Sequence, residues 1–159
     1  TIRLLGNHPS IAAWVIFNEG WGQFQTEDMT RIVRRLDPNR LIDQASGWFD
    51  QGGGDFSSLH NYFFKLFIRP ERERASVLSE FGGYSYREPG HCAKEKLYGY
   101  GICKNKKDLE KRFLERWSGV RNLIPQGLSA SIYTQWTDVE EEVNGVFTYD
   151  REVRKIEPF

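Results

Sequence analysis

Five short apolar segments, separated by helical or irregular stretches, set the hydrophobic pattern of this chain. The first, Ile11 to Phe17, is apolar throughout and lacks the alternation of a strand with one face in water. It therefore predicts a parallel strand that is covered on both faces. The other four segments predict strands at Leu41 to Ala45, Ser57 to Tyr62, Ala75 to Ser79 and Leu128 to Trp136.

Apolar stripes at helical spacing predict two helices between these strands. Thr26 is the expected N-cap of the first, and Asp37-Pro38-Asn39 ends it. Asp108 is the expected N-cap of the second, and its apolar face comprises Leu109, Phe113, Leu114, Trp117, Val120, Leu123 and Ile124. The segment from Tyr84 to Lys107 is long and glycine-rich, which favours an irregular binding loop.

The alternation of strands with helices or irregular connections is typical of an α/β fold with a parallel sheet. Polar side chains lie at the ends of the strands or directly after them, at Asn18-Glu19, His60-Asn61-Tyr62, Glu80 and Gln135-Trp136-Thr137-Asp138. In α/β architectures ligands are handled where strands end at their carboxyl side. These positions are therefore the candidate site.

Two of the polar residues, Glu19 and Glu80, are acids that directly follow separate predicted strands. Two carboxylates across one pocket are what glycosidic bond cleavage requires, one to donate a proton and one to attack or assist at the anomeric carbon. A single glutamate after a strand is more often a helix-initiating or salt-bridged surface residue. The hypothesis of glycosidic bond cleavage therefore rests on the two acids together. The sequence does not give the distance between them.

Composition narrows the classes of partner. Lys plus Arg equals Asp plus Glu at 22 each, so no net charge favours nucleic acid or an anionic membrane. No apolar run approaches the roughly 18 to 20 residues of a membrane span, and we expect neither partner. Cys92 and Cys103 are expected to be free thiols, with a local disulfide as the alternative. Clustered Cys and His residues and a phosphate-cradling loop are absent from the sequence, so we expect no metal and no cofactor.

Several elements together resemble the catalytic domain of glycoside hydrolase family 2, the retaining enzymes that include β-galactosidases, β-glucuronidases and β-mannosidases. They run nearly end to end: Asn7-His8-Pro9-Ser10-Ile11, Trp14, Asn18-Glu19, Asp37-Pro38, Arg40, His60, Tyr62, Glu80-Phe81-Gly82, Gln135-Trp136, Asp138-Val139-Glu140, Asn144-Gly145 and Thr148-Tyr149-Asp150-Arg151. The combination is specific, although no single element is.

The resemblance implies a fold, a reaction and residue roles. Residues 1–159 would form the C-terminal half, about strands 4 to 8, of a (β/α)8 TIM barrel with parallel strands and the helices outside. Glu19 would be the acid/base and Glu80 the nucleophile of a retaining hydrolase acting on terminal β-glycosidic bonds. We expect β-galactosidase-like specificity. The alternatives are β-glucuronidase- or β-mannosidase-type specificity, or a sugar-binding relative without catalysis.

Each further candidate has a physical role. Asn18 can donate an amide hydrogen bond to the sugar 2-hydroxyl, and Trp136 can form an apolar platform under the sugar ring. Tyr62 and His60 are expected near Glu80 as hydrogen-bond donors, with His60 also contacting substrate. Glu19 has to be protonated at working pH, which apolar neighbours such as Phe17 and Trp21 would favour.

The remaining expectations concern specificity and assembly. The Asn-x-Lys pattern that holds a glucuronate carboxylate in relatives is not matched well by Asn105-Lys106-Lys107, although Asn61 and Lys65 leave it open. Asp138 is expected on a solvated face, with fixing a loop or touching substrate as alternatives. A half-barrel alone exposes strand edges, so we expect the isolated chain to be inactive and to self-associate through the open half-barrel.

Overall fold

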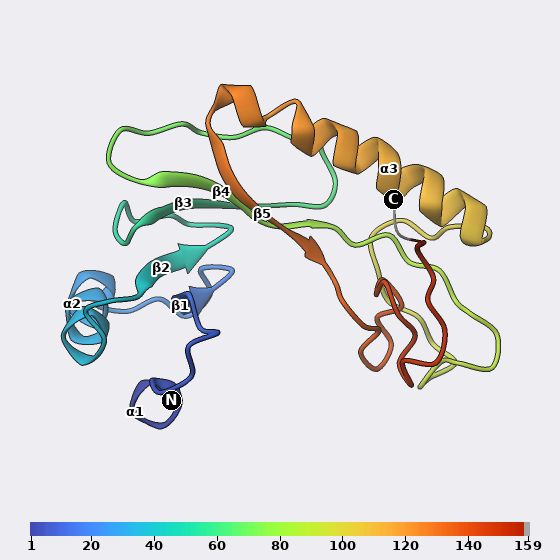
Figure 1. The fold of residues 1–159 in the computed structure, drawn as a ribbon, viewed down its shortest axis with the longest axis horizontal. Helices are drawn as coiled ribbons and strands as arrows, with labels where there is room; N and C mark the ends of the chain where they lie inside the picture. The colour runs from blue at the N-terminus through green and yellow to red at the C-terminus, as the bar shows by residue number, and fades with distance from the viewer. Residues whose placement is uncertain (158–159) are drawn as a thin grey trace. The chain divides into compact units, whose positions relative to one another are not determined.

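The computed structural model describes residues 1–157. The elements follow in the order α1 (Ile2–Leu5), β1 (Ala13–Asn18), α2 (Thr26–Leu36), β2 (Leu41–Ser46), β3 (Phe56–Asn61), β4 (Ala75–Gly82), α3 (Lys106–Arg121), the short 3-10 turn η1 (Ile124–Gln126) and β5 (Leu128–Thr134). β1 pairs with β2 in parallel, and β3, β4 and β5 form a second sheet in that order (Figure 1). The predicted sequence of strands, helices and irregular segments is confirmed.

Two compact units divide the chain. Unit 1 comprises residues 1–60, 67–79 and 125–130, and unit 2 comprises residues 61–66, 80–124 and, among the described residues, 131–157.

In unit 1, α2 lies beside the parallel pair β1 and β2 (Figure 1). Acidic Glu27 and Asp28 in its first turn and basic Arg34 and Arg35 in its last turn complement the helix dipole. Thr26 was expected to cap α2, but the N-cap position is Gln25, whose side chain makes no cap hydrogen bond. That prediction was wrong by one residue because Thr26 already has helical backbone geometry, and its carbonyl accepts the Thr30 hydroxyl.

The predicted burial of the first strand on both faces is wrong. Within β1 only Phe17 is buried, and Val15 is 54% exposed. The strand covered on both faces is β2, in which every residue after Leu41 is buried. The difference arises because β2 lies between β1 and further chain, including an antiparallel bridge from Asp43 to Gly54.

The turn from α2 into β2 is fixed by Asp37. Its carboxylate accepts the Trp14 indole N–H at 2.9 Å and pairs with Arg40 at 2.6 Å, and the Trp14 bond holds its pKa below the usual value. Arg40 also donates to the carbonyl oxygens of Ile11 and His8. The contacts of Trp14, Asp37 and Arg40 therefore fix the chain that leads into β1.

In unit 2, α3 packs over a core of Cys103, Leu109, Phe113 and Ile156, which Tyr84, Tyr86, Tyr133 and Val146 extend. The N-cap of α3 is Asn105, whose side chain accepts the backbone N–H of Asp108 at 2.9 Å. Asp108, predicted as the cap, instead lies in the first turn. Two residues predicted on the buried face, Leu114 and Ile124, are 49% and 59% exposed, since Leu114 is turned away from Phe113 and Ile124 lies beyond the helix.

The segment between β4 and α3 is irregular, as predicted, and is anchored at several points. Ser85 bridges to Ile102, and the backbone N–H of Tyr98 donates to the carbonyl of Glu141 at 2.8 Å. Both cysteines are free thiols, with Cys103 buried. Among the helices that the structure describes, none has the length and apolarity to cross a bilayer.

Candidate active site

Glu19 lies at the turn that follows β1, in unit 1. Its backbone has φ 56°, a left-handed conformation that is costly for a residue with a side chain. The Glu19 N–H donates to Ser46 Oγ at 3.3 Å, and the Ser46 hydroxyl donates to Asn18 Oδ1 at 2.8 Å. Asn18 and Ser46 are register partners across β1 and β2, so strand pairing brings these groups together. Ser46 was not among the predicted site residues.

The bond from Ser46 also sets the orientation of the Asn18 amide. Because the Ser46 oxygen accepts the Glu19 N–H, its own hydrogen is directed to Asn18 Oδ1. Asn18 is exposed, and its Nδ2 then carries the amide hydrogens away from Ser46. This leaves a donor group of the kind predicted for a sugar hydroxyl.

The carboxylate of Glu19 contacts His60. His60 Nδ1 lies 3.1 Å from Glu19 Oε1, and the side chains are 1% and 27% exposed respectively. Trp48 packs edge-on against the imidazole, and a Cβ added at Gly47 would come within 2.3 Å of the ring. The lack of a side chain at Gly47 therefore makes the space in which His60 reaches Glu19.

The apolar surroundings expected for Glu19 are not its main contacts. Trp21 is 64% exposed and packs against Phe49, while Phe17 packs edge-on against Phe24. The partner on the carboxylate is instead a buried ring nitrogen. Asp43 on β2 is a buried acid that was not predicted, and burial raises the pKa of its carboxyl.

Glu80 lies in unit 2, within β4 and not after it as the sequence suggested. The Tyr62 hydroxyl donates to Glu80 Oε2, and it also lies 3.2 Å from the Thr134 hydroxyl. Tyr62 was one of the two donors expected at Glu80, and this contact is confirmed. Burial and the neighbouring carboxylate raise the pKa of Tyr62, which keeps the hydroxyl protonated as a donor.

The ring of Tyr62 is held by a tight stack. It lies parallel to Tyr100 with ring centres 4.1 Å apart. Gly83 lies against both rings, and a Cβ there would come within 2.9 Å of each. The donor at Glu80 is thus fixed by packing as well as by its hydrogen bond.

Trp136 follows β5 and is 69% exposed, with its ring tilted against Phe147 at 5.0 Å. It is an exposed apolar surface, as a sugar platform requires, and not a core residue. The neighbouring Gln135 donates to Asn144 Oδ1 at 2.7 Å and to Glu142 Oε2 at 3.2 Å. This fixes the chain on one side of Trp136.

Asp138 is buried, so the expectation that it lies on a solvated face is wrong. Lys155 Nζ donates to Asp138 Oδ1 at 2.6 Å and to the carbonyl oxygens of Val143 and Tyr86, with both charged side chains essentially inaccessible. The alternative in which Asp138 fixes a loop is confirmed. Lys155 was missed because a lysine near the end of a polar stretch gives no indication of burial.

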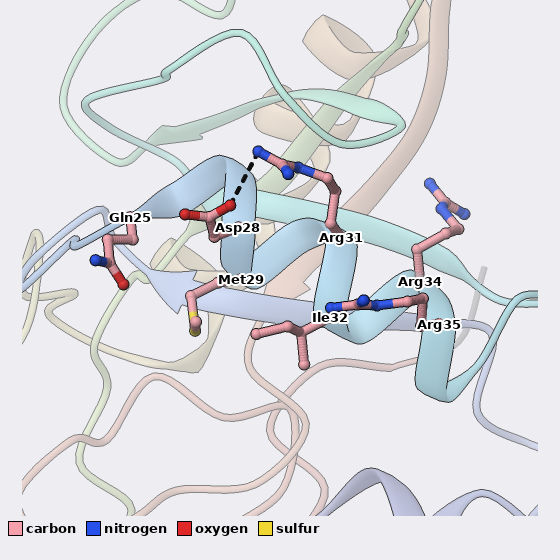
Figure 2. Close-up of a pocket in the computed structure, with 7 residues that line it drawn as sticks. All are labelled: Gln25, Asp28, Met29, Arg31, Ile32, Arg34 and Arg35. Atoms are coloured by element: carbon pink, nitrogen blue, oxygen red, sulfur yellow. Dashed lines mark ion pairs between the residues drawn. The ribbon is translucent and has the colours of Figure 1, made fainter.

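Groups that could ligate a cation occur near the C-terminal segment. One nitrogen of His91 and carboxylate oxygens of Asp150 and Glu152 lie within 4.8 Å of one another, and His91 Nδ1 is 2.7 Å from Asp150 Oδ2. All three are at least partly exposed. The pocket in Figure 2 lies on α2 and contains the ion pair of Asp28 with Arg31; it is lined by Gln25, Asp28, Met29, Arg31, Ile32, Arg34 and Arg35. None of the predicted site residues lines it.

The structure thus groups the predicted residues by unit. Asn18, Glu19 and His60 belong to unit 1, with Ser46 and Gly47 as their supports. Tyr62, Glu80 and Trp136 belong to unit 2.

Comparisons with known proteins agree on the fold. The solved structures that match include a β-D-glucuronidase from Dictyoglomus thermophilum, at TM-score 0.63 and 16% identity over 96% of this chain, and a Ruminococcus gnavus β-glucuronidase, at TM-score 0.59 and 16% identity over 93% of it. The matches cover 31% and 30% of those chains, so this chain spans about a third of their length. No curated protein matched the sequence.

A family model described as "Glycosyl hydrolases family 2, TIM barrel domain" matches residues 1–88, which is more than half of the 159-residue chain. The match includes Asn18-Glu19, His60, Tyr62 and Glu80, while Trp136, Asp138 and Lys155 lie beyond it. The expected α/β fold, a partial TIM barrel, is confirmed. The chain belongs to family 2 of the glycosyl hydrolases.

Proposed function

We propose that the protein hydrolyses terminal β-glycosidic bonds with retention of configuration, with Glu19 as acid/base and Glu80 as nucleophile. The observation that carries the proposal is that the two carboxylates contact different kinds of polar side chain. Glu80 accepts from a tyrosine hydroxyl, whereas Glu19 contacts an imidazole nitrogen. Family membership supplies the reaction class.

In the first step a Glu80 oxygen attacks the anomeric carbon and forms a glycosyl ester. The bond from that carbon to the leaving oxygen breaks, and Glu19 gives this oxygen its proton. The Tyr62 hydroxyl donates to Glu80 before the attack, which fixes the carboxylate, and Thr134 is a second polar neighbour of that hydroxyl. Asn18 Nδ2 donates to the sugar 2-hydroxyl, and Trp136 stacks on the apolar face of the ring.

In the second step water attacks the anomeric carbon and the ester bond breaks, which restores the Glu80 carboxylate. Glu19, now ionised, accepts the proton of that water. Its partner His60 suits both states of Glu19, since a neutral imidazole nitrogen either donates to a carboxylate or accepts from a carboxylic acid. His60 is therefore proposed as a positioning residue for the acid/base.

For the sugar we propose a neutral β-galactoside-type substrate. The asparagines considered for holding a glucuronate carboxylate are already engaged: Asn105 caps α3, and the Asn61 amide donates to the Lys65 carbonyl while its oxygen accepts the Phe64 N–H. The second candidate is a β-glucuronide, which the names of both matched structures favour. Hydrolysis of p-nitrophenyl β-galactoside, β-glucuronide and β-mannoside by the full-length protein distinguishes these substrates.

We further propose that residues 1–159 are part of a longer catalytic barrel, so that the chain alone is inactive and pairs with a second copy. Val15 on β1 and Ile132 on β5 are apolar strand residues that are more than half exposed, which favours association. Light scattering of the isolated chain tests the pairing, and a monomer that hydrolyses an aryl β-glycoside would contradict both parts.

The roles of the two acids are tested by azide rescue in the full-length protein. Glu80→Ala should lose about 10⁴-fold or more in turnover, and azide should restore product as the α-glycosyl azide, because azide then replaces the nucleophile. Glu19→Ala should lose about 10²- to 10⁴-fold, and azide should give the β-glycosyl azide by attacking the ester. Nuclear magnetic resonance of the product identifies the anomer.

Glu27→Ala is the matched control, since Glu27 is an exposed acid on α2 that pairs with Arg31. It should keep wild-type turnover and give no azide product. Wild-type turnover in Glu80→Ala, or the same anomer from both variants, would overturn the assignment.

A further inference from the structure

Thr134, the last residue of β5, reaches Glu80 through Tyr62. The Thr134 hydroxyl oxygen lies 3.2 Å from the Tyr62 hydroxyl, which donates to Glu80 Oε2. A phenol has a single hydrogen, and an ionised carboxylate is the stronger acceptor for it. The hydrogen between Thr134 and Tyr62 therefore comes from Thr134, and the phenolic oxygen accepts it. The two hydroxyls thus form a chain in which each donates in the direction of Glu80.

The Thr134 hydroxyl is held in place beside Tyr62. Thr134 is a β-branched residue in a strand, which restricts its χ1 angle. Its carbonyl accepts the Gly83 N–H at 3.0 Å, and Gly83 lies against the Tyr62 ring. The turn at Gly83 therefore contacts both members of this hydrogen bond.

The direction of the chain strengthens Tyr62 as a donor to Glu80. A hydroxyl whose oxygen accepts a hydrogen bond becomes a better donor itself, and the gain is larger where water is excluded. Tyr62 is buried. Burial and Glu80 raise the pKa of Tyr62, whereas the Thr134 hydroxyl lowers it. Thr134 therefore makes the phenol more acidic than burial and Glu80 alone would.

We propose that Thr134 is a positioning residue that acts through Tyr62 to favour release of the sugar from Glu80. This inference rests on the proposed function, in which Glu80 forms a glycosyl ester. In the first step the Glu80 carboxylate loses its negative charge as it attacks, so a stronger donor to that carboxylate does not help. Thr134 therefore does not speed the formation of the ester.

The second step reverses the movement of charge on Glu80. The water oxygen bonds to the anomeric carbon, the electron pair of the ester C–O bond returns to Glu80, and the proton of the water passes to Glu19. A stronger donor stabilises the charge that returns to Glu80, and this interaction grows toward the transition state. Thr134 therefore speeds the hydrolysis of the ester.

Two substrates separate the steps in the full-length protein. A 2,4-dinitrophenyl β-glycoside has so good a leaving group that hydrolysis of the ester limits turnover, whereas formation of the ester limits a phenyl β-glycoside. Thr134→Val keeps the branched shape and removes the hydroxyl. It should lower kcat about three- to tenfold on the dinitrophenyl glycoside. On the phenyl glycoside kcat/KM should stay within about twofold of the wild type.

Thr134→Ser keeps the hydroxyl and should retain the wild-type rate on the dinitrophenyl glycoside. Thr30→Val is the matched control, since it makes the same change in α2, where the Thr30 hydroxyl donates to the Thr26 carbonyl. It should leave the rates on both substrates unchanged. Equal slowing of both substrates by Thr134→Val, slowing of neither, or a Thr134→Ser as slow as Thr134→Val would overturn the inference.

Mass spectrometry of the acid-quenched enzyme distinguishes these failures from failure of the proposed function. During turnover of the dinitrophenyl glycoside the sugar should be found on Glu80, and a larger fraction should carry it in Thr134→Val. A sugar on another residue, or none, would overturn the proposed function and this inference with it. A sugar on Glu80 in the same fraction of both proteins would overturn the inference alone.

Discussion

Glu19 and Glu80 are surrounded by residues of different types. Around Glu19 the supports are small polar groups and a glycine at strand ends, namely Ser46, Asn18, Gly47 and the buried His60. Around Glu80 they are aromatic rings, with Tyr62 stacked on Tyr100 and both packed against Gly83. One setting is a hydrogen-bonded turn and the other is a packed stack.

The difference corresponds to what each proposed role demands. An acid/base changes its protonation state twice in a turnover, and an imidazole nitrogen accommodates both states. A nucleophile needs one fixed position and one donor that keeps its proton. The raised pKa of Tyr62 provides such a donor.

The largest expected effect concerns the support of the segment that follows β5. Lys155→Met should lower the free energy of unfolding by about 3–5 kcal/mol, because it leaves the Asp138 carboxylate buried without its cation. Lys94→Met is the control, since Lys94 pairs with Glu140 and Glu141 at the surface. Urea unfolding of both variants tests this, and an equally stable Lys155→Met would show that the buried pair is not needed.

A second pair of variants compares the supports of Glu19 with those of Glu80. Gly47→Ala and Gly83→Ala each place a methyl group against the ring that supports a carboxylate, at 2.3 Å from His60 and 2.9 Å from Tyr62 and Tyr100. Both should be destabilised, by about 1–3 kcal/mol, with the larger loss for Gly47→Ala because its approach is closer. Thermal unfolding measures the order.

Backbone strain is separated from ring contact by two other glycines. Gly52 and Gly90 also have positive φ, of 81° and 84°, but a Cβ at either would meet nothing within 4 Å. Gly52→Ala and Gly90→Ala should therefore show only the smaller cost of strain. Losses as large as those of Gly47→Ala and Gly83→Ala would mean that the rings are not what requires glycine.

The smallest effect is a pH dependence confined to unit 2. His91 donates to Asp150, and this bond, with Glu152 and Glu88 nearby, raises the pKa of His91 above 6.5. Asp150 has a pKa of about 2, mainly through the Thr148 hydroxyl, and stays ionised at neutral pH. The pair therefore stabilises fully below pH 6.5 and loses this contribution as pH rises through the raised pKa of His91.

His91→Gln should remove that part of the pH dependence of the melting temperature between pH 5 and pH 9. Glu152→Gln is the control, since Glu152 lies 4.0 Å from His91 and contributes less. An unchanged pH profile in His91→Gln would show that the pair does not stabilise unit 2.

The order of elements and the approximate ends of the strands followed from the hydrophobic pattern, because helix and strand periodicity and turn-forming residues are local features of the sequence. What the pattern could not supply was which strand is enclosed. β1 is the more apolar sequence, yet β2, with Asp43 and Gln44 in its middle, is the buried strand. The burial of a strand depends on neighbours that are distant in the chain, and the sequence of one segment does not show which neighbours it will have.

The candidate acids and Tyr62 were found because they follow or precede apolar strands and match a family pattern. Their supports were missed for a physical reason. Ser46, Gly47 and Gly83 are small residues whose importance depends on what lies against them, and Lys155 is a charged residue in a position that buries it. The residue types alone therefore do not indicate that these positions support the site.

The left-handed backbone at Glu19 has a consequence for how such a site persists under mutation. Glycine adopts φ 56° without the cost that a side chain incurs there, so Glu19→Gly would remove that backbone cost together with the proposed acid. Selection for stability and selection for catalysis then act in opposite directions on one residue. A glutamate kept at this position would reflect selection for chemistry.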